Sequence, residues 1–142
     1  MEELVIDSSV IAKWFIIESL RDKALKLRDD YLDGKFRLAA PHIMPLEVLN
    51  ATRLAQKNIG ATKLAEIGQS LSLYGVRLFE LRDEYLREAV ETALKNEITI
   101  FDASYIALAK HLQTRVCTAD IELLDRLHQD YRQYATHLHE YR

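Results

Sequence analysis

The sequence predicts an α/β protein, a three-layer α/β/α sandwich around a mostly parallel β-sheet. Short apolar runs alternate along the chain with longer segments whose apolar residues recur at helical spacing. This alternation is typical of parallel sheets, because each crossover between parallel strands needs about the length of a helix. The length of 142 residues, with 49% hydrophobic and 29% charged residues, fits one globular domain over residues 1–142.

Each expected element follows from its local pattern. In chain order, strands are expected at residues 4–6, 37–40, 76–81, 115–118 and 134–138. Helices are expected at residues 9–18, 20–32, 45–57, 62–73, 83–96 and 103–112. The segment 83–96 has the clearest pattern, since its apolar residues form one stripe, and Pro45 suits the first position of its helix.

Composition restricts the function classes without choosing one. The chain has 19 basic and 22 acidic residues, so its formal charge of −3 predicts neither binding nor exclusion of nucleic acid. The acidic start and the absence of an apolar stretch of roughly 20 residues argue against a signal peptide and a membrane span. Cys117 has no partner for a disulfide and lies in an apolar context. We therefore expect a reduced, soluble, cytoplasmic protein with a buried, unreactive thiol.

Four acidic residues stand where strands end or helices begin. Asp7 closes the first expected strand, and Asp120 follows the fourth. Glu47 lies in the first turn of the helix at Pro45, and Asp102 stands at the start of another helix. The carboxyl ends of parallel strands meet at one edge of a sheet, where function gathers. We therefore expect the four side chains to face the same edge.

Each acid alone has an ordinary explanation, because Asp at a helix N-cap and Glu in a first turn are common and complement the helix dipole. Four carboxylates at one edge would repel one another, and a divalent cation would resolve that conflict. Mg²⁺ and Mn²⁺ prefer carboxylate oxygens and water. The set suits metal-assisted hydrolysis of a phosphodiester.

These motifs resemble those of PIN-domain ribonucleases. The resemblance rests on the order Val-Ile-Asp-Ser-Ser, Pro-Leu-Glu-Val-Leu-Asn, Asp-Ala-Ser-Tyr-Ile-Ala-Leu-Ala and Thr-Ala-Asp, and it spans nearly the whole chain. The sequence looks most like the toxin subunits of VapBC-type toxin-antitoxin pairs. That resemblance implies a five-stranded parallel sheet, cleavage of RNA with Mg²⁺ or Mn²⁺, a homodimer and inhibition by a small antitoxin protein.

By position, four residues match the acidic metal-binding and catalytic set of this family: Asp7, Glu47, Asp102 and Asp120. The polar residues beside them match supporting roles, although each also suits a cap, a solvated helix position or a strand: Ser8, Ser9, Asn50 and Thr118. Many relatives have another acid soon after the fourth one. Here Glu122 or Asp125 stands in that region, and helix phase does not choose between a fifth acid and a solvated charge.

Other candidate residues have mainly structural explanations. Four basic residues follow the acidic motifs and either contact phosphates or solvate helices: Lys13, Arg53, Lys57 and Lys110. The pair Trp14-Phe15 favours core or dimer packing over base stacking. His137 and His139 do not make a closed metal site on their own.

Four function classes compete with a toxin ribonuclease. A phosphoacceptor receiver domain is disfavoured, because Asp7 has no adjacent acid and the late strand has no terminal lysine. Ser9 likewise disfavours a phosphatase of the Asp-x-Asp type. A catalytically silent PIN-like binding or regulatory module and a free-standing RNA-processing nuclease both stay open.

Overall fold

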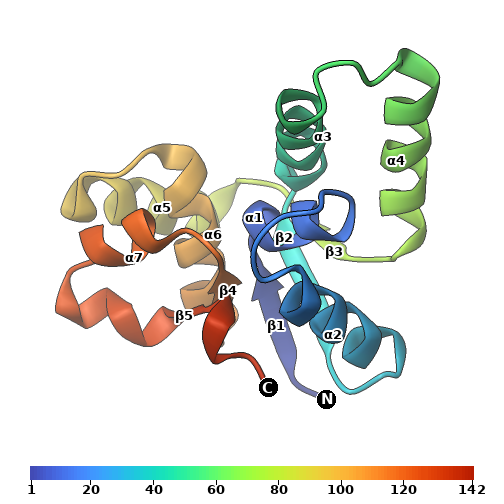
Figure 1. Ribbon diagram of the computed structural model, residues 1–142. Helices are drawn as coiled ribbons and strands as arrows, with labels where there is room; N and C mark the ends of the chain where they lie inside the picture. The colour runs from blue at the N-terminus through green and yellow to red at the C-terminus, as the bar shows by residue number, and fades with distance from the viewer.

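The computed structural model describes residues 1–142 and contains an all-parallel, five-stranded sheet with helices on both sides (Figure 1). The strands lie in the order β3-β2-β1-β4-β5, so β1 is central. This arrangement confirms the predicted α/β fold. The strand bounds are β1 Glu3–Ile6, β2 Arg37–Pro41, β3 Arg77–Phe79, β4 Val116–Thr118 and β5 Ala135–His137.

The helices form two groups around these strands. In Figure 1, α5, α6 and α7 lie to one side of the strands, and α2, α3 and α4 lie to the other. The α-helices are α1 Ser8–Ile11, α2 Arg21–Leu32, α3 Met44–Ala55, α4 Ala61–Leu73, α5 Asp83–Asn96, α6 Ile100–His111 and α7 Ile121–Arg126. Three 3₁₀ turns complete the chain, namely η1 Ala12–Trp14, η2 Gln129–Tyr134 and η3 Leu138–Glu140.

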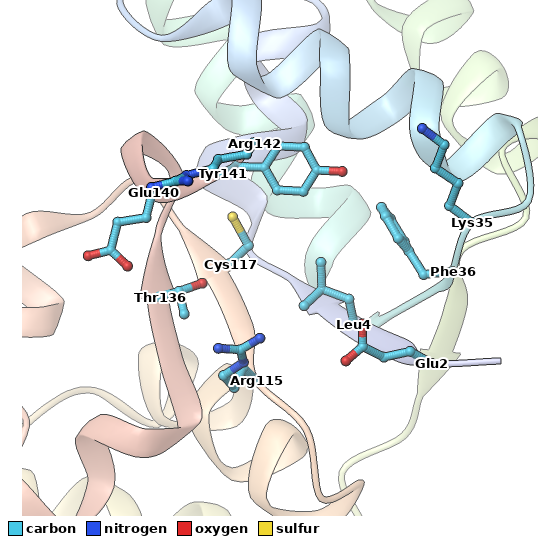
Figure 2. A pocket seen from close by; sticks show the side chains of 10 residues that line it. All are labelled: Glu2, Leu4, Lys35, Phe36, Arg115, Cys117, Thr136, Glu140, Tyr141 and Arg142. Carbon is cyan, nitrogen blue, oxygen red and sulfur yellow. The ribbon is translucent and has the colours of Figure 1, made fainter.

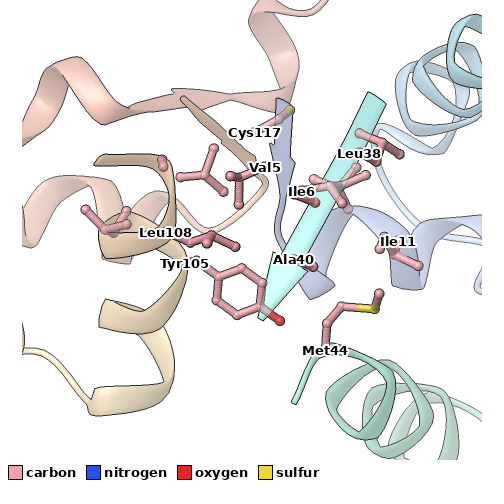
Figure 3. Close-up of a cluster of buried hydrophobic side chains, with 14 of the residues drawn as sticks. Val5, Ile6, Ile11, Leu38, Ala40, Met44, Tyr105, Leu108 and Cys117 are labelled. Carbon is pink, nitrogen blue, oxygen red and sulfur yellow. The ribbon is translucent and has the colours of Figure 1, made fainter. Parts of the chain in front are cut away.

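The central strand is buried on both faces. Val5 and Ile6 are fully buried, and successive side chains of a strand point to opposite faces. Val5 points toward Tyr105 of α6, whereas Ile6 and Leu38 point toward Ile11 of α1 (Figure 3). A strand covered on both faces is typical of parallel sheets with helices in both outer layers. The core therefore fixes the direction in which β1 delivers the residue that follows it.

The expected helix at 9–18 is shorter in the structure, and that prediction was wrong at its end. The chain leaves η1 after Trp14 and turns through Leu20, whose φ is 61°. Arg21 donates from Nε to the carbonyl of Lys13 at 2.9 Å and from a terminal nitrogen to the carbonyl of Trp14 at 3.1 Å. These are carbonyls that a continuing α-helix would use, so the Arg21 side chain ends the helix.

The helix α7 was not predicted. Its six residues span less than two turns and give little periodicity to detect. Asp120 starts α7 as its N-cap, and its Oδ1 accepts the amide N–H of Leu123 at 3.1 Å. The expected start of α6 was also late by three residues, because Thr99 caps that helix before Ile100.

Trp14 is a core residue, as one of the two sequence interpretations expected. Its side chain is 4% exposed, and its Nε1–H donates to the carbonyl of Ala24 at 3.0 Å. Its ring lies 4.9 Å from that of Tyr74. Trp14 is therefore not a platform for stacking bases.

None of the helices combines the length and the apolar character that crossing a bilayer requires.

Candidate active site

The four predicted acids come from four different elements around the central strand. Asp7 directly follows β1, and Asp120 follows β4, the neighbour of β1 in the sheet. Glu47 lies in the first turn of α3, the helix that comes after β2 on the other side of β1. Asp102 lies in the first turn of α6. Because the strands are parallel, their carboxyl ends share one edge, and this edge carries the site.

Asp7 is held by two hydroxyl groups. Its side chain is almost buried, and its Oδ2 accepts hydrogen bonds from Ser9 Oγ at 2.6 Å and Thr118 Oγ1 at 2.7 Å. Ser9 Oγ accepts the amide N–H of Ala119 at 3.0 Å, and Thr118 Oγ1 accepts that of Asp120 at 3.0 Å. The network joins the end of β1 to the end of β4. It leaves Asp7 Oδ1 without a hydrogen bond from the protein.

The pKa of Asp7 is raised to about 6, because burial and the negative charges of Glu47 and Asp102 raise it more than the hydrogen bonds from Ser9 and Thr118 lower it. Asp7 stands at the N-cap position of α1 but makes no side-chain capping bond. Helix capping therefore does not account for this carboxylate.

Glu47 is held by a buried tyrosine. Tyr105 Oη donates to Glu47 Oε1 at 2.6 Å, and in Figure 3 the Tyr105 hydroxyl points toward Met44 at the start of α3. Burial raises the pKa of Glu47, as does the charge of Asp102, while hydrogen bonds from Tyr105 and Ser8 lower it. Burial and the nearby acids also raise the pKa of Tyr105, so its hydroxyl stays a proton donor.

Asp102 is not the cap of its helix. Thr99 is the N-cap of α6, and its Oγ1 accepts the amide N–H of Asp102 at 3.1 Å. Burial raises the pKa of Asp102, and the charge of Asp120 adds to the rise. A hydrogen bond between the Asp102 side chain and Thr99, and the positive charge of Arg126, lower it. Arg126 belongs to α7, so this short helix supplies both the fourth acid and a nearby cation.

The four carboxylates form one cluster without a bonded cation. Charge repulsion links Asp7 with Glu47 and Asp102, and links Asp102 with Asp120. None of the four makes an ion pair with a lysine, arginine or histidine. Among them, only Asp120 is explained by helix capping. The cluster thus concentrates negative charge that no ion pair within the protein neutralises.

The donor set fits a hard divalent cation with few protein ligands. All four side chains offer carboxylate oxygens, which Mg²⁺ and Mn²⁺ prefer. No three His, Cys, Asp or Glu side chains form a group that could hold a metal ion together. A cation here would therefore take one or two carboxylates directly and complete its shell with water, as Mg²⁺ commonly does.

Three of the four expected supporting residues contact the acids, and the fourth does not. Ser9 and Thr118 contact Asp7, and Ser8 contributes a hydrogen bond to Glu47. Asn50 is exposed on α3 and makes no hydrogen bond to Glu47. Its geometry gives no support to the expected supporting role.

The candidate fifth acids and several basic residues lie elsewhere. Glu122 and Asp125 are exposed on α7, and neither charge perturbs the cluster. Lys13 is buried and pairs with Glu18 at 3.1 Å, so it is not free to meet a phosphate. Lys110 lies near the far end of α6, about 12 Å along the helix axis from Asp102, and its Nζ is 5.6 Å from the centre of the Tyr131 ring.

Arg53 and Lys57 are both exposed. Arg53 lies in the last turn of α3, and Lys57 follows that helix. Both stay available to solvent, as the sequence allowed.

Sequence reasoning missed Tyr105 and Arg126. Tyr105 stands within an apolar run of α6 and appears as a core residue, and 58 positions separate it from Glu47. Its only signal is a hydroxyl in a segment otherwise poor in polar groups. Arg126 lies in α7, a helix that the sequence did not predict, so its position near Asp102 could not be predicted either.

A depression of about 450 Å³ lies at the opposite edge of the sheet and includes none of the four acids (Figure 2). Its lining includes Leu4, Phe36, Cys117 and Tyr141. Burial raises the pKa of the Cys117 thiol to about 12, which agrees with the expected unreactive cysteine. The depression is therefore separate from the acidic cluster.

A family model for the PIN domain matches residues 4–128. The chain belongs to the PIN-domain family. Its PIN domain is 26% identical over 126 residues to Ribonuclease VapC3 of Pyrobaculum aerophilum, an alignment that covers 87% of this chain and 94% of that protein.

Solved structures share the fold of this PIN domain. PAE2754 from Pyrobaculum aerophilum gives a TM-score of 0.62 at 24% identity, covering 98% of this chain and 85% of that one. FitAB bound to an IR36 DNA fragment gives a TM-score of 0.68 at 14% identity, and the match covers 95% of this chain and 94% of that one. A toxin-antitoxin complex from Klebsiella pneumoniae gives a TM-score of 0.57 at 12% identity, and the match covers 82% of this chain and 86% of that one. The likeness to these structures is one of fold.

The raised pKa of Asp7 predicts a pH-dependent effect of Asp7→Asn in this PIN domain. Folding raises the pKa from 3.8 to about 6, so the ionised carboxylate destabilises the native state above pH 6, and the cost disappears below pH 4. Two pKa units correspond to about 3 kcal/mol. In EDTA, the free energy of unfolding of Asp7→Asn, relative to wild type, should rise by up to about this amount between pH 4 and pH 7.5.

Glu122→Gln is the matched control, because Glu122 is an exposed acid on the nearby helix α7. Urea unfolding followed by circular dichroism at several pH values makes the comparison. Parallel stability curves for wild type and Asp7→Asn over this range would contradict a destabilising charge at Asp7.

Proposed function

We propose that this protein is a metal-dependent endoribonuclease that hydrolyses RNA phosphodiester bonds as the toxin of a toxin-antitoxin pair. The main support is the cluster of four carboxylates at the carboxyl edge of the sheet, none of which forms an ion pair with a basic side chain. RNA as the substrate is supported by the relative named Ribonuclease VapC3. The toxin role is supported by the fold shared with a toxin-antitoxin complex of Klebsiella pneumoniae.

The proposed cofactor is Mg²⁺ or Mn²⁺, held by Asp7, Asp102 and Asp120 directly or through water, with Glu47 beside them. When bound, the cation supplies positive charge that offsets charge on the phosphate and lowers the pKa of water. The tied oxygens of Asp7 and Asp120 limit how these carboxylates rotate. Their free oxygens are therefore oriented before a cation arrives, which lowers the cost of binding it.

Glu47 is the proposed proton acceptor. Its carboxylate is half-buried, and its raised pKa makes it a better base than an exposed glutamate. Tyr105 donates a hydrogen bond to one oxygen of Glu47 and so restrains its carboxylate. Arg126, whose positive charge acts on Asp102, is the proposed contact for a substrate phosphate.

Cleavage should leave a 5′-phosphate and a 3′-hydroxyl. If Glu47 takes a proton from water, the oxygen of that water bonds to phosphorus, the P–O3′ bond breaks, and the departing 3′ oxygen takes up a proton from solvent to become the hydroxyl. The ribose 2′-hydroxyl takes no part in that reaction, so 2′-deoxy substitution at the cut should still allow cleavage wherever binding does not need the hydroxyl. A 2′,3′-cyclic phosphate product would overturn this mechanism.

Asp102→Asn tests the site without disturbing a helix cap, because Thr99 caps α6. Without metal, the variant should be at least as stable as wild type, since repulsion with Asp120 is relieved. It should show a smaller rise in Tm with Mn²⁺ or Mg²⁺. Activity on a defined RNA panel should fall on the order of 100-fold or more, and EDTA should abolish wild-type activity.

Glu122→Gln serves again as control and should match wild type in both assays, because Glu122 is exposed and does not perturb the cluster. Equal metal responses and equal activities of Asp102→Asn and wild type over a full titration would remove Asp102 from the site. Undiminished wild-type cleavage in EDTA would remove the metal from the mechanism.

Tyr105→Phe tests whether the tyrosine positions Glu47. Loss of the hydroxyl removes a hydrogen bond that lowers the Glu47 pKa, so the pKa should rise. A base with a higher pKa is ionised only at higher pH, so the acidic limb of the pH–rate profile should shift upward. Activity at pH 6 should therefore fall more than activity at pH 8.

Tyr85→Phe is the matched control. It removes another buried hydroxyl, which donates to the carbonyl of Ser104 at 2.7 Å rather than to an acid. It should lower stability without shifting the pH–rate profile. A profile for Tyr105→Phe that coincides with that of Tyr85→Phe would leave Tyr105 as a packing residue.

The proposed partner is a small antitoxin protein that places an arginine among the four acids. Its planar guanidinium matches carboxylates in two-point geometry. Affinity for such an antitoxin should fall at least about tenfold in Asp7→Asn/Asp102→Asn, as measured by calorimetry with purified proteins. Equal affinity of the variant and wild type would exclude this acid-site contact and leave inhibition to another surface.

A homodimer is proposed as the assembly of the chain. Helix α5 carries an apolar stripe at Leu86, Val90 and Leu94, which are 41%, 39% and 75% exposed. Residues four apart share one helix face, so the stripe is continuous. An exposed apolar stripe of this kind is typical of an interface.

A further inference from the structure

Three of the four acids have an exposed apolar neighbour in the chain. These neighbours precede Glu47, precede Asp102 and follow Asp120. They are Leu46, Phe101 and Ile121, with exposed fractions of 67%, 55% and 58%. The acids act on one another through charge, and consecutive Cα atoms are only about 3.8 Å apart, so the three apolar residues border the same site. Exposed apolar residues scattered singly are ordinary, but apolar residues from three elements at one site indicate a binding surface.

Phe101 carries the only aromatic ring among these three residues. The ring stacks on no other ring of the protein, and no cation lies over it. It does not belong to the hydrophobic core, and it is not among the side chains packed against that core. The ring of Phe101 is therefore available to stack with a flat ligand.

The helix α6 directs Phe101 toward the acids. Phe101 and Tyr105 are four positions apart, so they lie about 40° apart around the helix axis and share one face. On this face the Tyr105 hydroxyl reaches Glu47 at 2.6 Å. Long side chains of a helix lean toward its N-terminus, so Phe101 lies beyond Tyr105, at the outer end of the face that contacts Glu47. The ring thus borders the space between Glu47 and Asp102.

The surroundings of this ring fit a nucleic acid base better than a protein. Residues 103–109 of α6 are all buried, so the helix has no extended apolar face that a partner protein could cover. A stable protein interface commonly covers about 800 Å² on each partner. A base is a flat ring system that stacks on a single aromatic side chain, whichever base it is. An RNA whose phosphate lies at the acids carries a base on each side of that phosphate.

We propose that Phe101 stacks on an unpaired base of the RNA beside the phosphate at the acidic cluster, a role that rests on the proposed ribonuclease function. In a duplex each base is paired and stacked on its neighbours, so its face is closed to the ring. In unpaired RNA the bases splay out and stack on aromatic side chains. Phe101 therefore favours single-stranded RNA at the cut without selecting a particular base.

The test combines Phe101→Ala with the removal of single bases from the RNA. An RNA that wild type cleaves is remade with an abasic nucleotide at each of the positions flanking the cut in turn, and kcat/KM is measured for each. With wild type, at least one of these substitutions should lower kcat/KM about fivefold or more. Phe101→Ala should lower kcat/KM for the intact RNA by a similar factor and should lose nothing further with that abasic nucleotide. Equal effects of every abasic nucleotide in wild type and Phe101→Ala would overturn the stacking contact.

Binding is measured separately from cleavage in Asp7→Asn/Asp102→Asn, by fluorescence anisotropy of end-labelled RNA. In this background Phe101→Ala should weaken binding of a single strand about fivefold or more and binding of the duplex of the same sequence less than about twofold. Equal losses for single strand and duplex would contradict stacking on an unpaired base. Absence of cleavage by wild type would overturn the ribonuclease but not this contact, so the two proposals have separate outcomes.

Leu73→Ala is the matched control, because Leu73 is 86% exposed at the end of α4, which leads to the start of β3 and so to the opposite edge of the sheet. It should match wild type in both assays. Phe101→Leu keeps an apolar side chain without a ring and should lose most of the effect, whereas Phe101→Tyr keeps a ring and should bind RNA more tightly than Phe101→Leu. Weaker affinity of Phe101→Ala for an antitoxin protein, with unchanged affinity for RNA, would assign the ring to a protein interface and overturn the proposal.

Discussion

The burial of a carboxylate at the end of the central strand is the constraint on which the site depends. β1 has neighbours on both sides and helices on both faces, so Asp7 leaves it into a position that water barely reaches. Its pKa of about 6 corresponds to a net cost of about 3 kcal/mol for the ionised carboxylate at neutral pH. Hydrogen bonds from Ser9 and Thr118 keep the cost from being larger, and Thr118 reaches Asp7 because β4 lies beside β1.

The same hydrogen bonds that stabilise the acids also direct them. In Asp7 and Asp120, one carboxylate oxygen receives bonds from the protein and the other receives none. Asp120 illustrates the overlap, because its Oδ1 caps α7 while its charge acts on Asp102. Helix capping and a role in the cluster are therefore compatible in one residue. Capping is excluded as an explanation only where another residue already provides the cap, as Thr99 does in the helix of Asp102.

The sequence was sufficient for the sheet and for the edge at which the acids meet. An apolar run that stops at an aspartate, as in Leu-Val-Ile-Asp, marks both a buried strand and the residue at its carboxyl end. Contacts between segments far apart in the chain could not be predicted from the sequence. The bond between Tyr105 and Glu47 joins two helices, and the ending of η1 depends on a side chain seven residues later. Lys13 looked solvated by its pattern, but the turn after Trp14 brings Glu18 back to it.

Stability alone gives no reason to keep all four acids. Asp7 and Asp102 make no side-chain cap, and Glu47 is half-buried with a raised pKa. Repulsion among buried carboxylates destabilises the native state, and uncharged residues of similar shape would avoid it. The surrounding hydroxyls of Ser9, Thr118 and Tyr105 hold these charges in place rather than neutralise them. A site that keeps its negative charge and fixes its oxygens is arranged for a positive ligand, which is the property the proposed chemistry needs.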